Sequence, residues 1–495
     1  MSEKAHDPFE RWLLLRIFSI LQFDDFAAGR LGVFNVLSRA GSLQPGRELE
    51  ERGDNHGAAK GVGVPNLNAD ESLALGQDGA VERSSVNPLA AHLGENLRDS
   101  DSEASDLESQ VQTRQGDSLR RWLIVGITTS IMGLIFGFAF AKSRVYEPHV
   151  IRAQFLFEKW IMLKMFLAAA GTSAAVFAVA AIVAPAKFEA ARLDWDSSRC
   201  GRGPRSAALG GMILGSGMAI AGACPGMVLP QVGAGVTNSG FTLLGGIIGA
   251  FAYGLLEPLM APLLRRYSGP SGKFAYVDEY VPLSFSQCSA LLALGCGLVV
   301  FLLEYLVPWQ SELSLPLEDD CSLQTFFKCY AWPPSVGGAL IGSLQIPVFA
   351  VVGTFLGSST SYQTTCSSWV LLLSDSISRY FTYAKRFARP TVDTHWQLFY
   401  VCMAILGAFL TEYASGLLGK VPGVPIGYGF CGGFLMVWGS RMGAGCTSGH
   451  GLSGMAVMML HSFLAVPFMF GAGIAVAFIA RAVDPSFYPG PAIQL

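Results

Sequence analysis

Residues 119–495 form a succession of apolar segments, most of them long enough to cross a lipid bilayer. A membrane-spanning helix needs about 20 predominantly apolar residues, and backbone surrounded by lipid must satisfy its hydrogen bonds within a helix or a closed barrel. We therefore expect an all-α polytopic membrane protein, integral and multi-pass, without being able to name the membrane. The segments lie at about 122–141, 161–184, 206–224, 239–263, 284–308, 334–356, 365–374, 396–418, 425–446 and 454–480.

Charge is concentrated at the N-terminal end. The first 118 residues carry 11 Lys and Arg and 20 Asp and Glu, whereas the remaining 377 carry 23 and 17. Because residues 41–118 are rich in Gly, Ser, Asn and acidic side chains, they cannot bury enough apolar surface to fold. We expect residues 1–118 to be a mostly disordered acidic extension with an interfacial helix near 10–36. The transmembrane domain then covers 119–495.

Several function classes are excluded by missing patterns. The chain has no basic stripe with interleaved aromatic residues, so a nucleic-acid partner is not expected. It has no ATP-binding loop and no C-x-x-C pair among its ten cysteines. We therefore expect no catalytic residues, cofactor or metal. Cys321 and Cys329 lie on a polar segment and could pair if that segment faces an oxidising compartment.

The most informative feature is an internal repeat. Residues 210–226 are GGMILGSGMAIAGACPG and residues 432–448 are GGFLMVWGSRMGAGCTS. A shift of 222 positions aligns both as Gly-Gly-x5-Gly-x6-Cys, with Cys224 matching Cys446. Each cysteine follows a glycine-rich apolar segment and precedes residues that interrupt a helix. We expect two pseudo-symmetric halves, about 120–264 and 284–482, whose broken or short re-entrant helices meet at the centre.

Such breaks suit anion binding, because they leave backbone amides free to donate hydrogen bonds. Thr447 or Ser448 is expected to cap a helix carrying residues 452–459. Thiols are weak donors and sulfur prefers polarizable partners, so two thiols beside free amides favour a soft anion. The alternative is that both cysteines are inert packing residues. The candidate substrate-binding residues at the breaks are Cys224, Pro225, Gly226, Cys446, Thr447, Ser448, Gly449, His450 and Gly451.

Two charged or titratable residues near the second break have competing interpretations. His450 could donate to a bound oxyanion or bond a neighbouring carbonyl. Arg441 precedes Cys446 by five residues, so it need not share the cavity face. An arginine inside the membrane is costly and is usually functional or paired. The simpler placement is at the membrane interface, which its long side chain can reach if this segment starts near a surface.

The stretches GACPGMVLPQVGAG (222–235) and GAGCTSGHGLSG (443–454) resemble the signature segments of the YeeE/YedE-type sulfur transport family. The resemblance covers roughly 120–482 and implies an all-helical fold that passes thiosulfate along central cysteines. Cys224 and Cys446 match two of the family's functional cysteines. A third family cysteine follows a Ser-Arg-Phe segment, and here Ser143-Arg144-Val145 is followed by Tyr146. Tyr146 could bond the anion instead, or Cys366 could replace the missing thiol.

The sequence therefore favours a transporter or channel for thiosulfate or a related sulfur-containing anion. Its expected partners are that anion, the bilayer and a cytosolic sulfur-handling protein. Two alternatives remain open: a membrane protein that transfers sulfur covalently as a persulfide, or a permease for another small anion.

Overall fold

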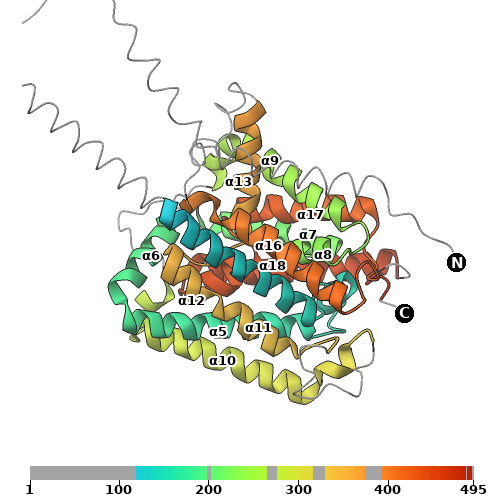
Figure 1. Ribbon diagram of the computed structural model, residues 1–495, viewed down its shortest axis with the longest axis horizontal. Helices are drawn as coiled ribbons and strands as arrows, with labels where there is room; N and C mark the ends of the chain where they lie inside the picture. The colour runs from blue at the N-terminus through green and yellow to red at the C-terminus, as the bar shows by residue number, and fades with distance from the viewer. Residues whose placement is uncertain are drawn as a thin grey trace, which may run out of the picture. The chain divides into compact units, whose positions relative to one another are not determined.

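The computed structural model describes residues 119–197, 202–264, 276–315, 329–373, 392–485 and 488–492. The acidic extension and the interfacial helix expected near 10–36 lie outside these residues. Within them the chain is helical, and an isolated antiparallel β-bridge joins Tyr276 to Met459. The expected all-α class is confirmed for this part of the chain (Figure 1).

The order of elements follows the order of the apolar segments. A helix over Leu119–Lys142 comes first. The later helices are α4 (Pro148–Phe155), α5 (Ile161–Val183), α6 (Pro185–Ser197), α7 (Pro204–Ala221), α8 (Val228–Gly233), α9 (Ser239–Leu264), η2 (Val277–Glu279), α10 (Phe285–Leu306), η3 (Trp309–Glu312), α11 (Pro334–Ser343), α12 (Gln345–Pro347), η4 (Val348–Val352), α13 (Thr360–Leu373), α16 (Val392–Ala414), α17 (Ile426–Met442), η5 (Ser448–Gly454) and α18 (Leu460–Val483).

Seven helices of the described part are long and apolar enough to cross a membrane. They are Leu119–Lys142, Ile161–Val183, Ser239–Met260, Phe285–Leu306, Pro334–Val352, Thr394–Ala414 and Leu460–Val483. The segment expected at 365–374 is instead the end of α13. Leu294, Leu298 and Phe301 of α10 remain largely exposed, which is the surface that lipid would cover.

The core of the fold is a close contact between α7 and α17. A Cβ atom added at Gly210 would lie 2.3 Å from the backbone nitrogen of Gly443, and one at Gly439 would lie 2.3 Å from that of Leu214. Gly217 and Gly432 meet the opposite helix in the same way, against Met436 and Ala221. These four of the six repeat glycines therefore let the backbones of α7 and α17 touch directly. The two-fold relation of the complete halves stays a prediction.

We predict that Gly210→Ala destabilises the protein by about 3 kcal/mol, the upper end of the usual cost of overpacking, because both neighbouring groups are backbone. The matched control is Gly295→Ala in α10, where an added Cβ meets nothing within 4 Å. The control should leave stability unchanged or raise it slightly, since alanine forms helix better than glycine. Unfolding in detergent measures both. Equal stability of the two variants would contradict the proposed role of the contact.

A buried ion-pair cluster joins the end of the first helix to α16. Arg144 Nη1 lies 2.9 Å from Glu412 Oε1, and Arg144 Nη2 lies 2.9 Å from Glu147 Oε1. All three side chains are almost fully buried. The ring of Tyr146 lies 4.9 Å from the guanidinium carbon of Arg144. This cluster fixes the connection between the first helix and α4, which borders the first break.

Removing one partner from such a cluster leaves a buried charge without compensation. We predict that Glu412→Ala costs about 3 kcal/mol of stability, the low end for a broken buried pair, because Glu147 still neutralises Arg144. Glu158→Ala is the control, because Glu158 pairs with Arg481 where both side chains are largely exposed. That pair is worth about 1 kcal/mol or less. Similar unfolding midpoints for the two variants would contradict the prediction.

Candidate functional site

The first break is built around Gly222, the residue that ends α7. Its φ of 60° is left-handed, which glycine adopts without strain. Gln231 of α8 then holds the turn, because its Nε2 donates to the carbonyls of Gly222 and Tyr146, each at 2.9 Å. Cys224 lies within this turn, and its carbonyl accepts hydrogen bonds from the amides of Met227 and Val228. The break therefore places Cys224 at a fixed position between α7 and α8.

The second break repeats this geometry 222 positions later. Ala444 matches Gly222 and also has a left-handed φ, of 62°. The chain then turns at Cys446 into η5, a π-helical turn whose residues are all buried. The predicted cap is wrong: the turn begins at Ser448, and neither hydroxyl caps a helix carrying 452–459. Thr447 Oγ1 instead points to the sulfurs of Met218 and Met469, at 3.3 and 3.5 Å.

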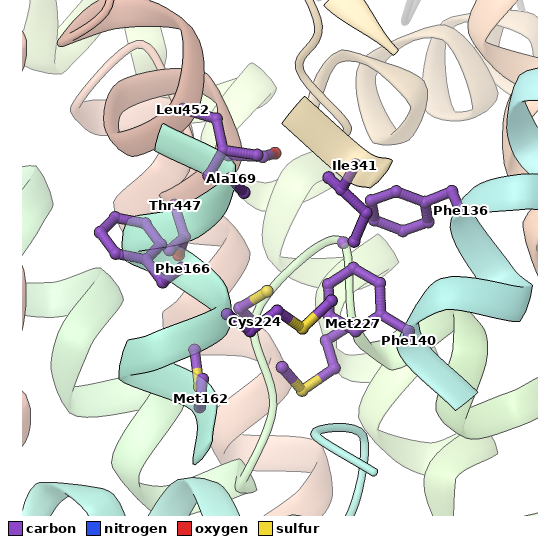
Figure 2. Close-up of a pocket in the computed structure, with 13 residues that line it drawn as sticks. Phe136, Phe140, Met162, Phe166, Ala169, Cys224, Met227, Ile341, Thr447 and Leu452 are labelled. Carbon is purple, nitrogen blue, oxygen red and sulfur yellow. The ribbon is translucent and has the colours of Figure 1, made fainter. Parts of the chain in front are cut away.

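A cavity of about 40 Å³ lies between the two breaks. Cys224 and Met227 lie at its centre in Figure 2, with Phe136 and Phe140 on one side and Phe166 and Thr447 on the other. Its wall is almost entirely apolar, and Thr447 and Ser448 are the hydroxyl-bearing residues among those that line it. The complete lining is Phe136, Phe140, Met162, Met165, Phe166, Ala169, Cys224, Gly226, Met227, Ile341, Thr447, Ser448 and Leu452.

A few hydrogen-bond donors lie near the sulfur of Cys224. The backbone amides of Gly226 and Met227 and the hydroxyl of Thr447 all lie within hydrogen-bond reach of it. Because Thr447 belongs to the second break, this contact brings the two breaks together. Cys224 and Cys446 are also close enough to interact electrostatically. The two repeat cysteines therefore lie near each other in the structure, while their role in binding a substrate stays a prediction.

Cys446 is not among the residues that line the cavity and is fully buried. Its Sγ is 3.1 Å from Ser448 Oγ, and the hydroxyl of Ser359 and the amide of Gly449 also lie within hydrogen-bond reach. Arg441 Nη2 donates to Ser359 Oγ. The expectation that Arg441 reaches the membrane interface is wrong: only 5% of its surface is exposed, and the guanidinium turns inward toward Ser359.

The remaining predicted residues hold the breaks in shape. His450 Nδ1 is 3.0 Å from Ser462 Oγ, and Nε2 is 3.1 Å from the carbonyl oxygen of Gly443. Because a carbonyl oxygen only accepts, Nε2 carries the hydrogen and donates it in this bond. Pro225 accepts a hydrogen bond from the Tyr362 hydroxyl at 2.9 Å. The backbone of Gly451 packs against the ring of Phe166. Of the two interpretations of His450, the structure contains the hydrogen bond to a neighbouring carbonyl, that of Gly443.

The two candidates for a third position are not among the residues that line the cavity. Tyr146 belongs to the buried cluster of Arg144, Glu147 and Glu412. Cys366 is buried in α13, where its Sγ donates to the carbonyl of Ile247 at 3.5 Å. Their roles as substrate ligands therefore remain predictions.

Several residues of the site were missed by sequence reasoning. The aromatic and methionine walls come from spans whose composition does not distinguish a cavity-facing side from a packed side. Ser358 and Ser359 were visible as part of the run Gly357-Ser358-Ser359-Thr360-Ser361 between apolar segments. A polar run at the start of a short apolar segment, α13, was the signal that could have identified them.

We predict that a small neutral thiol reagent reacts faster with Cys224 than with Cys366 in variants that keep one of these two cysteines. Cys224 borders the cavity, whereas Cys366 is buried against α9. Mass spectrometry of detergent-solubilised protein at timed intervals gives the two rates. Equal rates, or faster reaction of Cys366, would show that the cavity does not expose Cys224.

Comparisons with known proteins agree with this architecture. A family model described as sulphur transport matches residues 142–476, which include both breaks. The chain is also similar to the thiosulfate transporter TsuA of Spirochaeta thermophila, at 24% identity over 356 residues, covering 68% of this chain and 94% of that protein. With seven helices able to span a membrane, the chain is an integral multi-pass membrane protein that belongs to the sulphur transport family.

Proposed function

We propose that the protein transports thiosulfate or a closely related sulfur-containing anion, and that the anion passes Cys224 and then Cys446. The observation that carries this proposal is the composition of the cavity wall. Three methionines and Cys224 contribute sulfur to the lining, and Thr447 and Ser448 contribute hydroxyl groups. Thiosulfate has the matching chemistry, with one polarizable terminal sulfur and three oxygens that accept hydrogen bonds.

The sulfur-containing and aromatic groups of the lining and the hydrogen-bond donors near it interact with different parts of the anion. Sulfur and aromatic surfaces interact favourably with a polarizable atom, and they displace the water that would otherwise compete for it. In such surroundings each remaining donor has a stronger effect than it would in water. The amides of Gly226 and Met227, already directed at Cys224, and the two hydroxyls are the donors near the cavity.

The weakness of a thiol as a hydrogen-bond donor also favours release of the anion from the site. A transported ion must bind well enough to enter a site and weakly enough to leave it. A thiol provides a weak hydrogen bond, and two thiols close to each other allow the anion to exchange one for the next. The similarity to a protein named as a thiosulfate transporter supports this substrate.

The test is uptake of labelled thiosulfate by cells that lack their own route, with Cys224→Ser and Cys446→Ser compared at matched membrane expression. Loss of a thiol removes both the contact between two polarizable sulfurs and the weak hydrogen-bond donor. We therefore expect the uptake rate of each variant to be lower than that of the wild type by at least about tenfold. Cys431→Ser is the control, because Cys431 is exposed and outside the cavity lining. Tyr146→Phe and Cys366→Ser test the third position in the same assay.

Each of the other outcomes would favour a different function for this protein. Full uptake by both serine variants would contradict a thiol path and favour a permease for another small anion, since a hydroxyl satisfies a site without sulfur chemistry. A persulfide found on Cys224 or Cys446 after incubation with thiosulfate would favour covalent sulfur transfer. No uptake by the correctly inserted wild-type protein would reject thiosulfate as the substrate.

A further inference from the structure

We infer that Arg441, Ser359, Ser358 and Ser448 form with Cys446 a second anion-binding station beyond Cys224, in which Arg441 positions the hydroxyls and attracts the negative charge. This inference rests on the proposed function and adds to it a residue that selects for anions. It also assigns a role to the polar run that joins η4 to α13.

The first step is the location of the charge. Arg441 lies in the last turn of α17 and is 95% buried. Its electrostatic interactions extend to Cys446, Cys366 and Tyr362. The neighbouring cation, Arg202, is engaged elsewhere: it donates to the carbonyls of Arg441 and Met442 and pairs with Glu257 at 2.5 Å. Arg441 therefore places a buried cation near the second cysteine.

The second step is the direction of the hydrogen bonds. A guanidinium group only donates, so Ser359 Oγ must accept from Arg441 Nη2. The hydroxyl proton of Ser359 is then available to donate, and the neighbouring acceptor is the sulfur of Cys446. The amide of Gly449 donates to the same sulfur. With its sulfur accepting from two groups, Cys446 directs its own S–H toward Ser448 or toward an arriving anion.

The third step is the link between this cluster and the cavity. Ser448 borders the cavity and lies 3.1 Å from Cys446 Sγ. The backbone amide and hydroxyl of Ser358 both lie 3.5 Å from Ser448 Oγ, and a Cβ added at Gly226 would lie 3.0 Å from Ser358 Oγ. Ser358 and Ser448 thus link the Cys224 turn to Cys446, and Ser359, the residue after Ser358, accepts the hydrogen bond from Arg441.

These contacts explain why an anion should move past Cys224. The cavity wall near Cys224 is mostly aromatic and methionine, which binds the sulfur end but leaves the negative charge poorly solvated. The serine cluster offers hydroxyl donors with a buried cation behind them. In an interior of low dielectric constant this cation acts strongly over a few ångströms, so the anion is stabilised as it reaches Cys446.

The test compares Arg441→Gln, Arg441→Lys and the control Arg481→Gln at matched membrane expression. Arg481 pairs with Glu158 in exposed positions away from the cavity lining. Two quantities are measured: the apparent KM and maximal rate of thiosulfate uptake, and the thermal stabilisation of purified protein by thiosulfate. We expect Arg441→Gln to raise the apparent KM about tenfold or more, because a charge-assisted interaction is lost. Arg441→Lys should recover most of the affinity, because the charge is kept.

Recovery by lysine separates this role from simple packing. If glutamine and lysine lower uptake equally, or if Arg441→Gln keeps the wild-type KM, the inference is wrong while the thiol path can still stand. If Arg441→Gln does not insert, Ser359→Ala decides, because it keeps Arg441 and removes the hydroxyl between Arg441 and Cys446. A wild-type KM in Ser359→Ala would then reject the second station. Wild-type protein that neither transports nor binds thiosulfate would instead reject the proposed function.

Discussion

The direct backbone contact between α7 and α17 determines where every other part of the site lies. The glycines of both helices remove the side-chain layer that normally separates two helices. Each helix ends soon after this contact, and the chain turns at a left-handed residue, Gly222 or Ala444. Because the helices touch, the two turns that follow are brought to the same centre. Cys224 and Cys446 lie near each other there although 222 residues separate them in the chain.

The polar chemistry of the centre depends on what the turns expose. At Cys224 the turn provides amides directed at the sulfur, and at Cys446 it provides an amide and a serine hydroxyl. Gln231 donates to the carbonyl of Gly222 in the first turn and to that of Tyr146. Near the second turn, Gln345 donates to Ser453 Oγ and accepts from the amide of Leu356. Such ties are needed because buried backbone groups without partners are costly. The donors left near the sulfurs are therefore few and fixed.

Much of this could be predicted from the sequence, because apolar length and repeated glycines have direct physical consequences. Hydropathy located the spans, and the shared Gly-Gly-x5-Gly-x6-Cys pattern located the two breaks. The direction of Arg441 could not be predicted in this way. Its position in α17 allows both an interfacial and an inward rotamer, and the choice depends on Ser359, which lies 82 residues earlier in the chain. The aromatic residues of the cavity wall could not be predicted either, because nothing in the sequence distinguishes Phe136 and Phe166 from other phenylalanines of an apolar span.

The contact between the halves also determines the order in which the protein can be completed during synthesis. Thr447 packs against Met218, which lies 229 residues earlier in the chain. When α7 and its turn have been synthesised, neither α17 nor Thr447 has been made, so the Cys224 turn lacks the surface that will enclose it. Its donors and its thiol remain without their final neighbours until α17 and η5 have inserted. The last quarter of the chain is therefore needed to form the site in the first half.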